Sequence, residues 1–110
     1  MDLIEWKDFE KILMVTGTII KIEKFPEARK PTYKIWVDFG HYGKLKTSAQ
    51  LVKLYQPEDL IHKQIIGIIN FPEKQIGPFR SQFLLTGFET EDGIVITTVE
   101  RPVPNGTKIS

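Results

Sequence analysis

NFPEKQIGPFRSQFLLTGFETEDG, residues 70 to 93, read together with the closing VPNGTKI, residues 103 to 109, is the part of the sequence that decides the fold. It begins with the end of an apolar strand, passes a Pro turn into a basic loop with Phe79 at its tip, and continues through a Ser-Gln pair into a second apolar strand. Short apolar runs separated by Pro and Gly turns are typical of small antiparallel β proteins. The stretch therefore predicts two late barrel strands joined by a basic loop.

The residues before this stretch continue the pattern. Val15 to Phe25 is β-branched and apolar, and Gly17 inside the run indicates a bulge or a sharp bend. In YKIWVDFG, residues 33 to 40, apolar and polar residues alternate with a period of two, which predicts a half-buried strand with Trp36 facing away from the interior. A Gly-rich connection leads to residues 44 to 50, so these two strands should form a hairpin.

Two short helices and an extended tail complete the prediction. Apolar residues near helical spacing predict a short amphipathic helix at the N-terminus, and Pro57 limits residues 49 to 61 to one or two helical turns. The tail, residues 101 to 109, contains two prolines and an Asn-Gly pair and should run extended over a surface. The sum is an all-β, five- to six-stranded antiparallel barrel, an OB-fold, in one domain of residues 1–110.

Composition restricts the possible functions. Hydrophobic residues make up 41% of the chain and charged residues 26%, which are globular values and exclude a disordered chain. The formal net charge is only +1, so any attraction for nucleic acid must come from an uneven distribution of charge. Cysteine is absent, and acids interrupt the apolar residues of the N-terminus. We therefore expect a cytoplasmic protein without disulfides, signal peptide or membrane insertion.

Four ordered motifs extend the opening stretch into a family resemblance. They are DFEK (8–11), FPEARKP (25–31), TSAQL (47–51) and VPNGTKI (103–109). In this order they resemble the CsaA proteins, short members of the tRNA-binding-domain class that are described as secretion-related chaperones. The resemblance covers nearly the full length. It implies a homodimer formed through the N-terminal helix and the C-terminal tail, and an apolar groove for unfolded or secretory polypeptides. Covering of a sheet edge within one chain is the other explanation of the tail.

Basic residues give an alternative ligand, tRNA. They gather in segments 21–34, 44–53 and 63–80, and cations on one face of a barrel neutralise phosphates. A solvated lysine-rich surface is the other interpretation. The resemblance to tRNA-binding domains adds the positions of Asn70, Lys74 and the Ser81-Gln82 pair. The predicted nucleic-acid-binding residues are Arg29, Lys30, Lys46, Asn70, Lys74, Arg80, Ser81 and Gln82.

Aromatic residues interleaved with these bases are the candidates for peptide contacts. Trp36 is out of phase with the apolar face of its strand, and Phe79 lies between Pro78 and Arg80 in the expected loop, so both should be exposed. With Phe71 they form the predicted peptide-binding set. Exposed rings could equally stack unpaired bases, and rings such as Phe71 and Phe25 could instead fill the core.

Catalysis is not indicated. His41 and His62 lie in separate connections, and neither has a second His or Cys at the spacing of metal ligands. No Gly-rich loop has the spacing that cradles a phosphate. The sequence therefore predicts a binding protein that is not an enzyme and has no metal or other cofactor.

Overall fold

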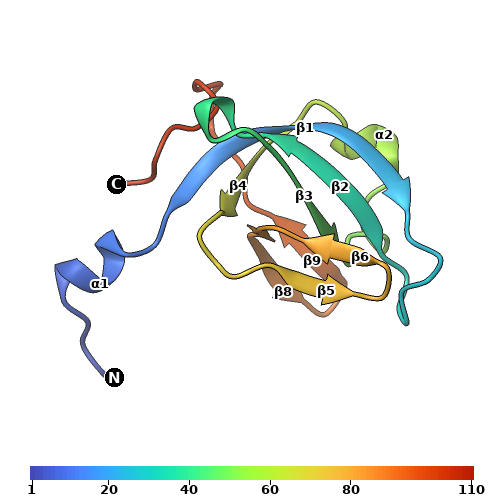
Figure 1. Cartoon of the computed structure of the whole chain (residues 1–110), viewed down its shortest axis with the longest axis horizontal. Helices are drawn as coiled ribbons and strands as arrows, with labels where there is room; N and C mark the ends of the chain where they lie inside the picture. Colours follow the sequence, from blue (N-terminus) through green and yellow to red (C-terminus); the bar gives the residue numbers. More distant parts are fainter.

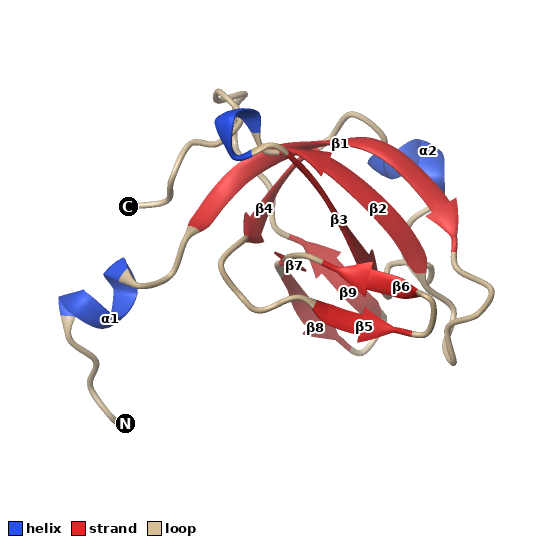
Figure 2. Ribbon diagram, viewed as in Figure 1, coloured by secondary structure: helices blue, strands red, loops and turns tan.

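The computed structural model describes residues 1–110, and its centre is an antiparallel sheet that curls into a nearly closed barrel (Figure 1). The sheet contains β1 (Met14–Lys24), β2 (Tyr33–Asp38), β3 (Lys44–Ala49), β4 (Gln64–Ile68) and β7 (Leu84–Leu85), in the spatial order β3-β2-β1-β4-β7. Two hairpins complete it, β5 (Lys74–Ile76) with β6 (Phe79–Ser81), and β8 (Gly87–Thr90) with β9 (Gly93–Ile96). Strands dominate (Figure 2), which confirms the predicted all-β OB-fold.

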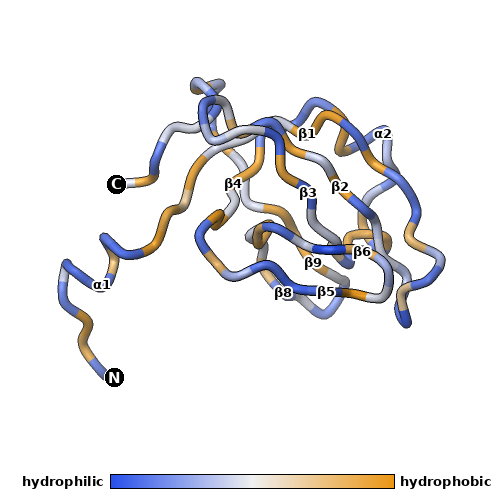
Figure 3. Tube along the Cα trace, viewed as in Figure 1, coloured by the Kyte–Doolittle hydropathy of each residue, from blue (hydrophilic) through white to orange (hydrophobic).

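Helices are short and lie outside the barrel. They are α1 (Trp6–Glu10), the 3-10 turn η1 (Gly40–Tyr42) and α2 (Pro57–Leu60). α2 begins at its proline, as the fixed φ of Pro favours, and buries Leu60. α1 buries no residue and stands away from the barrel, preceded by an apolar segment (Figure 3). None of these helices has the length and apolar character needed to cross a membrane.

Phe39 lies at the centre of the core. Its side chain is fully buried and meets the Phe83 ring edge-on, with the ring centroids 4.9 Å apart. A Cβ at Gly17 would lie 2.5 Å from Val37 Cγ1 and 2.6 Å from Phe39 Cδ1, so this glycine makes room for the core. Of the two features predicted at Gly17, a bulge or a sharp bend, the bulge lies elsewhere: the register with β2 shifts between Ile19 and Lys21.

The late strands differ from the prediction. The basic loop expected at residues 74–80 is the β5–β6 hairpin, and the single strand expected after it is divided among β6, β7 and β8. The division has a topological cause, because each piece pairs with a different partner: β6 with β5, β7 with β4 and β8 with β9. Sequence periodicity does not record a change of partner.

The tail covers an edge of β1. Residues 106–109 run beside the first half of β1, with Gly106 N donating to Thr16 O (2.7 Å) and Ile109 N donating to Met14 O (2.9 Å). Lys108 forms an isolated antiparallel bridge with Val15. The second half of β1 pairs with β2 instead. The tail therefore runs extended, as predicted, and protects an edge that β2 leaves open.

Candidate binding surfaces

Side chains close the seam between β3 and the segment that follows β6. The Gln82 N–H donates to Lys46 O (2.8 Å), and the Lys46 N–H donates back to Gln82 Oε1 (3.1 Å). The Ser48 N–H donates to Ser81 Oγ (3.1 Å), and the two serine hydroxyls are also 3.1 Å apart. Ser81 and Gln82, both predicted to bind nucleic acid, are thus engaged through their side chains in holding the barrel together.

A groove lies beside this seam. It consists of two hollows of ≈ 500 Å³ each, which share Ser48, Ile76 and Leu84. We call it the seam groove. Phe71, Pro72 and Lys74 line one hollow, and Arg29, Lys30 and Ile94 are among the residues that line the other. Apolar side chains are open to solvent here, since Phe71 is 54% exposed and Leu84 48%.

The two rings considered for the core behave differently. Phe25 is buried and packs 5.4 Å from Phe79 between ring centroids. Phe71 is exposed on the groove wall and does not fill the core. Contacts account for the burial of Phe25, because the Phe79 ring packs against it and Lys34 Nζ lies 4.9 Å from its centroid, whereas Phe71 lies in the loop after β4.

A lysine face lies on the outer side of the sheet. Tyr33, Ile35 and Val37 point inward from β2, so Lys34 and Trp36 point outward. Directly opposed residues of antiparallel strands share a face, and Trp36 is opposed by Lys21 on β1 and by Lys46 on β3. We use the name lysine face for Lys21, Lys34 and Lys46 together with the rings of Phe25, Trp36 and Phe79.

The ammonium groups of the lysine face lie over these rings. Lys21 Nζ is 4.6 Å from the Trp36 ring centroid, Lys34 Nζ is 4.9 Å from that of Phe25, and Lys46 Nζ is 5.0 Å from that of Phe79. These distances are in the cation–π range. Lys21 also pairs with Glu23 at 3.4 Å. The face therefore presents positive charge supported by aromatic side chains.

The prediction that Phe79 is an exposed loop tip is wrong. Its side chain is only 6% exposed, because the β5–β6 hairpin folds back and places the ring against Phe25 and Trp36. Trp36 faces outward as predicted but is half-buried. Neither ring offers an open face on which a base could stack, since Phe79 is buried and Lys21 lies over Trp36.

The remaining predicted residues fall into three groups. Arg29, Lys30 and Lys74 are exposed on the groove and form no ion pair. Arg80 pairs with Glu73 at 3.6 Å. Asn70 bonds to the backbone before β1. The sequence analysis did not single out Lys21 and Lys34, which the structure places beside Lys46. The outward phase of Lys34 was readable, whereas the position of Lys21 depends on the bulge.

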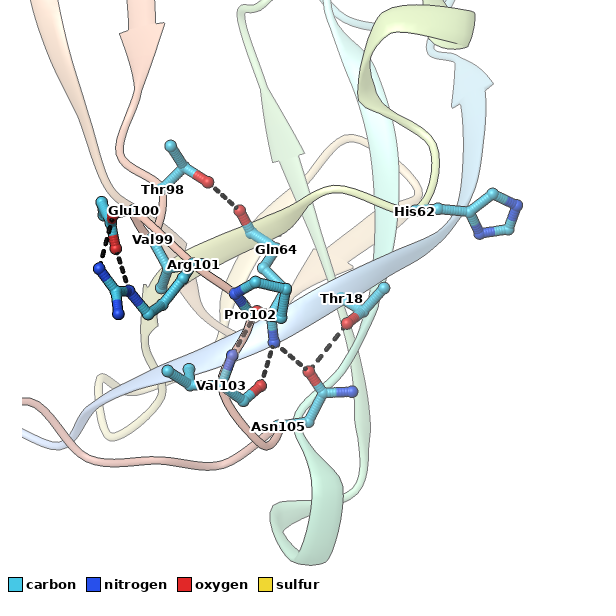
Figure 4. A pocket seen from close by; sticks show the side chains of 10 residues that line it. All are labelled: Thr18, His62, Gln64, Thr98, Val99, Glu100, Arg101, Pro102, Val103 and Asn105. Carbon is cyan, nitrogen blue, oxygen red and sulfur yellow. Dashed lines mark hydrogen bonds and ion pairs between the residues drawn. The ribbon is translucent and has the colours of Figure 1, made fainter.

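A third hollow, of ≈ 520 Å³, lies between β4 and the tail and is mostly polar (Figure 4). The Gln64 side chain bonds to both backbone groups of Val103, donating to the carbonyl at 2.6 Å and accepting from the N–H at 3.0 Å. Asn105 Oδ1 accepts from Thr18 and from Gln64. These groups satisfy one another and anchor the tail. Nowhere in the chain do three His, Cys, Asp or Glu side chains come together as metal ligands would.

Comparison with known protein families gives one match. Residues 14–108 match the family described as "Putative tRNA binding domain". The match covers the barrel and the docked tail and begins after α1.

Known proteins show similarity over the whole chain. The chaperone CsaA of Picrophilus torridus is 39% identical, with a TM-score of 0.93 over 98% of this chain and 100% of that one. The chaperone CsaA of Bacillus anthracis str. Ames is 38% identical, with a TM-score of 0.92 over 99% and 100%. The methionine–tRNA ligase of Pyrococcus horikoshii is 28% identical over 99% of this chain, which spans only 15% of the ligase. The family and the chaperone neighbours point to a non-catalytic binding module.

Proposed function

The chain belongs to the tRNA binding domain family, and within it we propose a polypeptide-binding chaperone of the CsaA type that acts as a homodimer. The seam groove is the observation that carries this proposal. Phe71 and Leu84 remain open to solvent there, and Ile76 lines both hollows. Open apolar side chains in two neighbouring hollows that share lining residues fit an extended, unfolded segment of polypeptide. The resemblance of the whole chain to CsaA chaperones supports the same assignment.

The groove suits clients of many sequences. Contacts through Phe71, Ile76 and Leu84 depend on apolar area and not on hydrogen-bond patterns, so they select for unfolded chains as a class. Arg29 and Lys30 line one hollow and Lys74 lines the other, so charged side chains accompany the apolar contacts in both. Trp36 and Phe79, our other two predicted peptide contacts, belong to the lysine face, so we assign the main apolar contact to Phe71.

The dimer is proposed to form through the N-terminal segment. Leu3 is 90% exposed, Ile4 75% and Trp6 67%, and no residue of α1 is buried within the chain. An apolar surface of this kind on a helix detached from its barrel fits a contact with a second copy. The tail, which is already docked on β1, would widen that contact through its outer edge. We place the dimer in the cytoplasm, where unfolded or secretory polypeptides are its clients.

Phe71→Ala tests the groove, with Phe88→Ala as a matched control. Phe88 is 64% exposed but lies on the β8–β9 hairpin outside the groove. Loss of one buried ring contact removes about 1.5–3 kcal/mol, so Phe71→Ala should weaken binding of a fluorescently labelled, permanently unfolded polypeptide by at least about ten-fold. Phe88→Ala should leave it unchanged. Equal effects of the two substitutions would refute the groove assignment.

The lysine face favours a second candidate function, binding of a folded RNA such as tRNA. Lys21, Lys34 and Lys46 come from three neighbouring strands and present charge over one surface. Arg29, Lys30 and Lys74 add charge on the groove, whereas Lys21 and Arg80 would first have to leave Glu23 and Glu73. Since the rings are covered, this face would contact phosphates and not bases. Titrating tRNA binding with salt tests it.

A further inference from the structure

Asn70 ties the N-terminal segment to the barrel. Its side-chain amide donates to Lys11 O (2.7 Å), and its Oδ1 accepts from the Leu13 N–H (3.0 Å). The neighbouring Ile69 N–H donates to Leu13 O (3.0 Å). The regular β1–β4 ladder ends one step earlier, at the pair Met14 and Ile68. The Asn70 amide therefore stands in for a further rung of the ladder.

Toward the N-terminus, no hydrogen bond to the barrel follows those of Asn70. We call residues 1–12 the arm. The hydrogen bonds of α1 are all local: the Asp8 N–H donates to Glu5 O, the Glu5 N–H to Asp8 Oδ2, and the Ile12 N–H to Phe9 O. Its only aromatic contact, between Trp6 and Phe9, is also internal. The direction in which the arm leaves the barrel is thus fixed at residues 11–13, where Asn70 holds them (Figure 1).

The Asn70 bonds need not serve the stability of the barrel. Asn70 is exposed, and water could satisfy the backbone groups of Lys11 and Leu13 in its absence. Water cannot, however, fix the direction of the backbone between Lys11 and Leu13, as the two bonds to one side chain do. A partner that binds Leu3, Ile4 and Trp6 gains from an arm already held in place, because less conformational entropy is then lost on binding.

We propose that Asn70 is the positioning residue of the arm, and that it sets the affinity of the homodimer without belonging to the interface. This inference rests on the proposed dimer. It gives Asn70 a task other than the nucleic-acid contact predicted from the sequence, since both polar atoms of its amide are already engaged.

Asn70→Asp is the informative substitution. The carboxylate keeps the acceptor for the Leu13 N–H but places an oxygen against Lys11 O, where the amide had a donor. Gln75→Glu is the matched control, since it makes the same chemical change in the nearby β5 strand, where the Gln75 amide bonds only to Gly77 O. Dimer dissociation is measured by sedimentation over a range of protein concentration, and folding is checked by denaturant unfolding.

Asn70→Asp should weaken the dimer by about ten-fold, or about 1.4 kcal/mol, which is within the range expected for two neutral hydrogen bonds lost, one in each copy. Gln75→Glu should leave the dimer unchanged. Trp6→Ala removes the contact that the arm makes with the second copy. If Asn70 acts through the arm, adding Asn70→Asp to Trp6→Ala should therefore weaken the dimer little further. Additive effects of the two substitutions would overturn the inference. An Asn70→Asp dimer that dissociates at the same concentration as the wild-type dimer would also overturn it. A wild-type chain that stays monomeric would refute the proposed dimer and this inference with it.

Discussion

Replacing Lys21, Lys34 and Lys46 together by Gln should flatten the salt dependence of tRNA binding. Each ammonium that neutralises one phosphate contributes about 0.9 to the slope of log affinity against log salt. Between 50 and 200 mM salt this amounts to about 3.5-fold for each lysine and about 40-fold for three. The wild-type advantage over the variant should therefore be about 40-fold larger at 50 mM than at 200 mM. The three residues share one face, so a single RNA backbone can reach all of them.

The assay is filter binding or fluorescence anisotropy with total tRNA at four salt concentrations. A control variant carries Gln in place of Lys53, Lys63 and Lys108, which are exposed, form no ion pair and lie outside the lysine face. Both variants lose three charges, so the net charge falls from +1 to −2 in each. Equal slopes for the two variants would show that only net charge matters, and would refute the assignment of this face.

Two further predictions concern stability. Burial, with Glu58 and Asp59 as lesser causes, raises the pKa of the Tyr33 phenol. The unfolded state therefore ionises first, and the free energy of unfolding should fall as pH rises above about 10. In denaturant titrations from about pH 8 to 11 the free energy of unfolding of Tyr33→Phe should fall less steeply than that of the wild type, and parallel curves would contradict this. Gln64→Ala removes three hydrogen bonds to the tail and should cost about 1–3 kcal/mol. It should also speed hydrogen exchange at the Gly106 amide, and unchanged exchange would show that the tail is held by other contacts.

The fold was largely predictable because its signals are local. The alternation in residues 33–38 depends only on which side of one strand is buried, and the structure places Tyr33, Ile35 and Val37 inside as predicted. Pro57 likewise marks the start of α2 by its own geometry. The barrel class follows from several such segments in order.

The site was less predictable because it depends on contacts between distant segments. Phe79 is buried only because β1 and β2 bring Phe25 and Trp36 beneath it. Lys21 shares a face with Lys46 only because the register shifts after Ile19, and nothing in the local sequence specifies that shift. Ser81 and Gln82 read as ligand contacts in the sequence, yet they close a seam whose other side is residues 46–48, more than 30 positions away.

Asn70 and Phe71 are neighbours in the sequence, and they bring the proposed dimer contact next to the proposed polypeptide-binding groove. Asn70 holds the arm and Phe71 lines the seam groove, and no flexible residue separates them. A polypeptide that contacts Phe71 therefore lies one residue from the side chain that orients the arm. Coupling between two sites is reciprocal, so assembly of the dimer would change client affinity by the same factor as clients change dimer affinity. Such coupling requires that a client bind more tightly when the arm is held than when it is released, and the 54% exposure of Phe71 makes its ring available to that client.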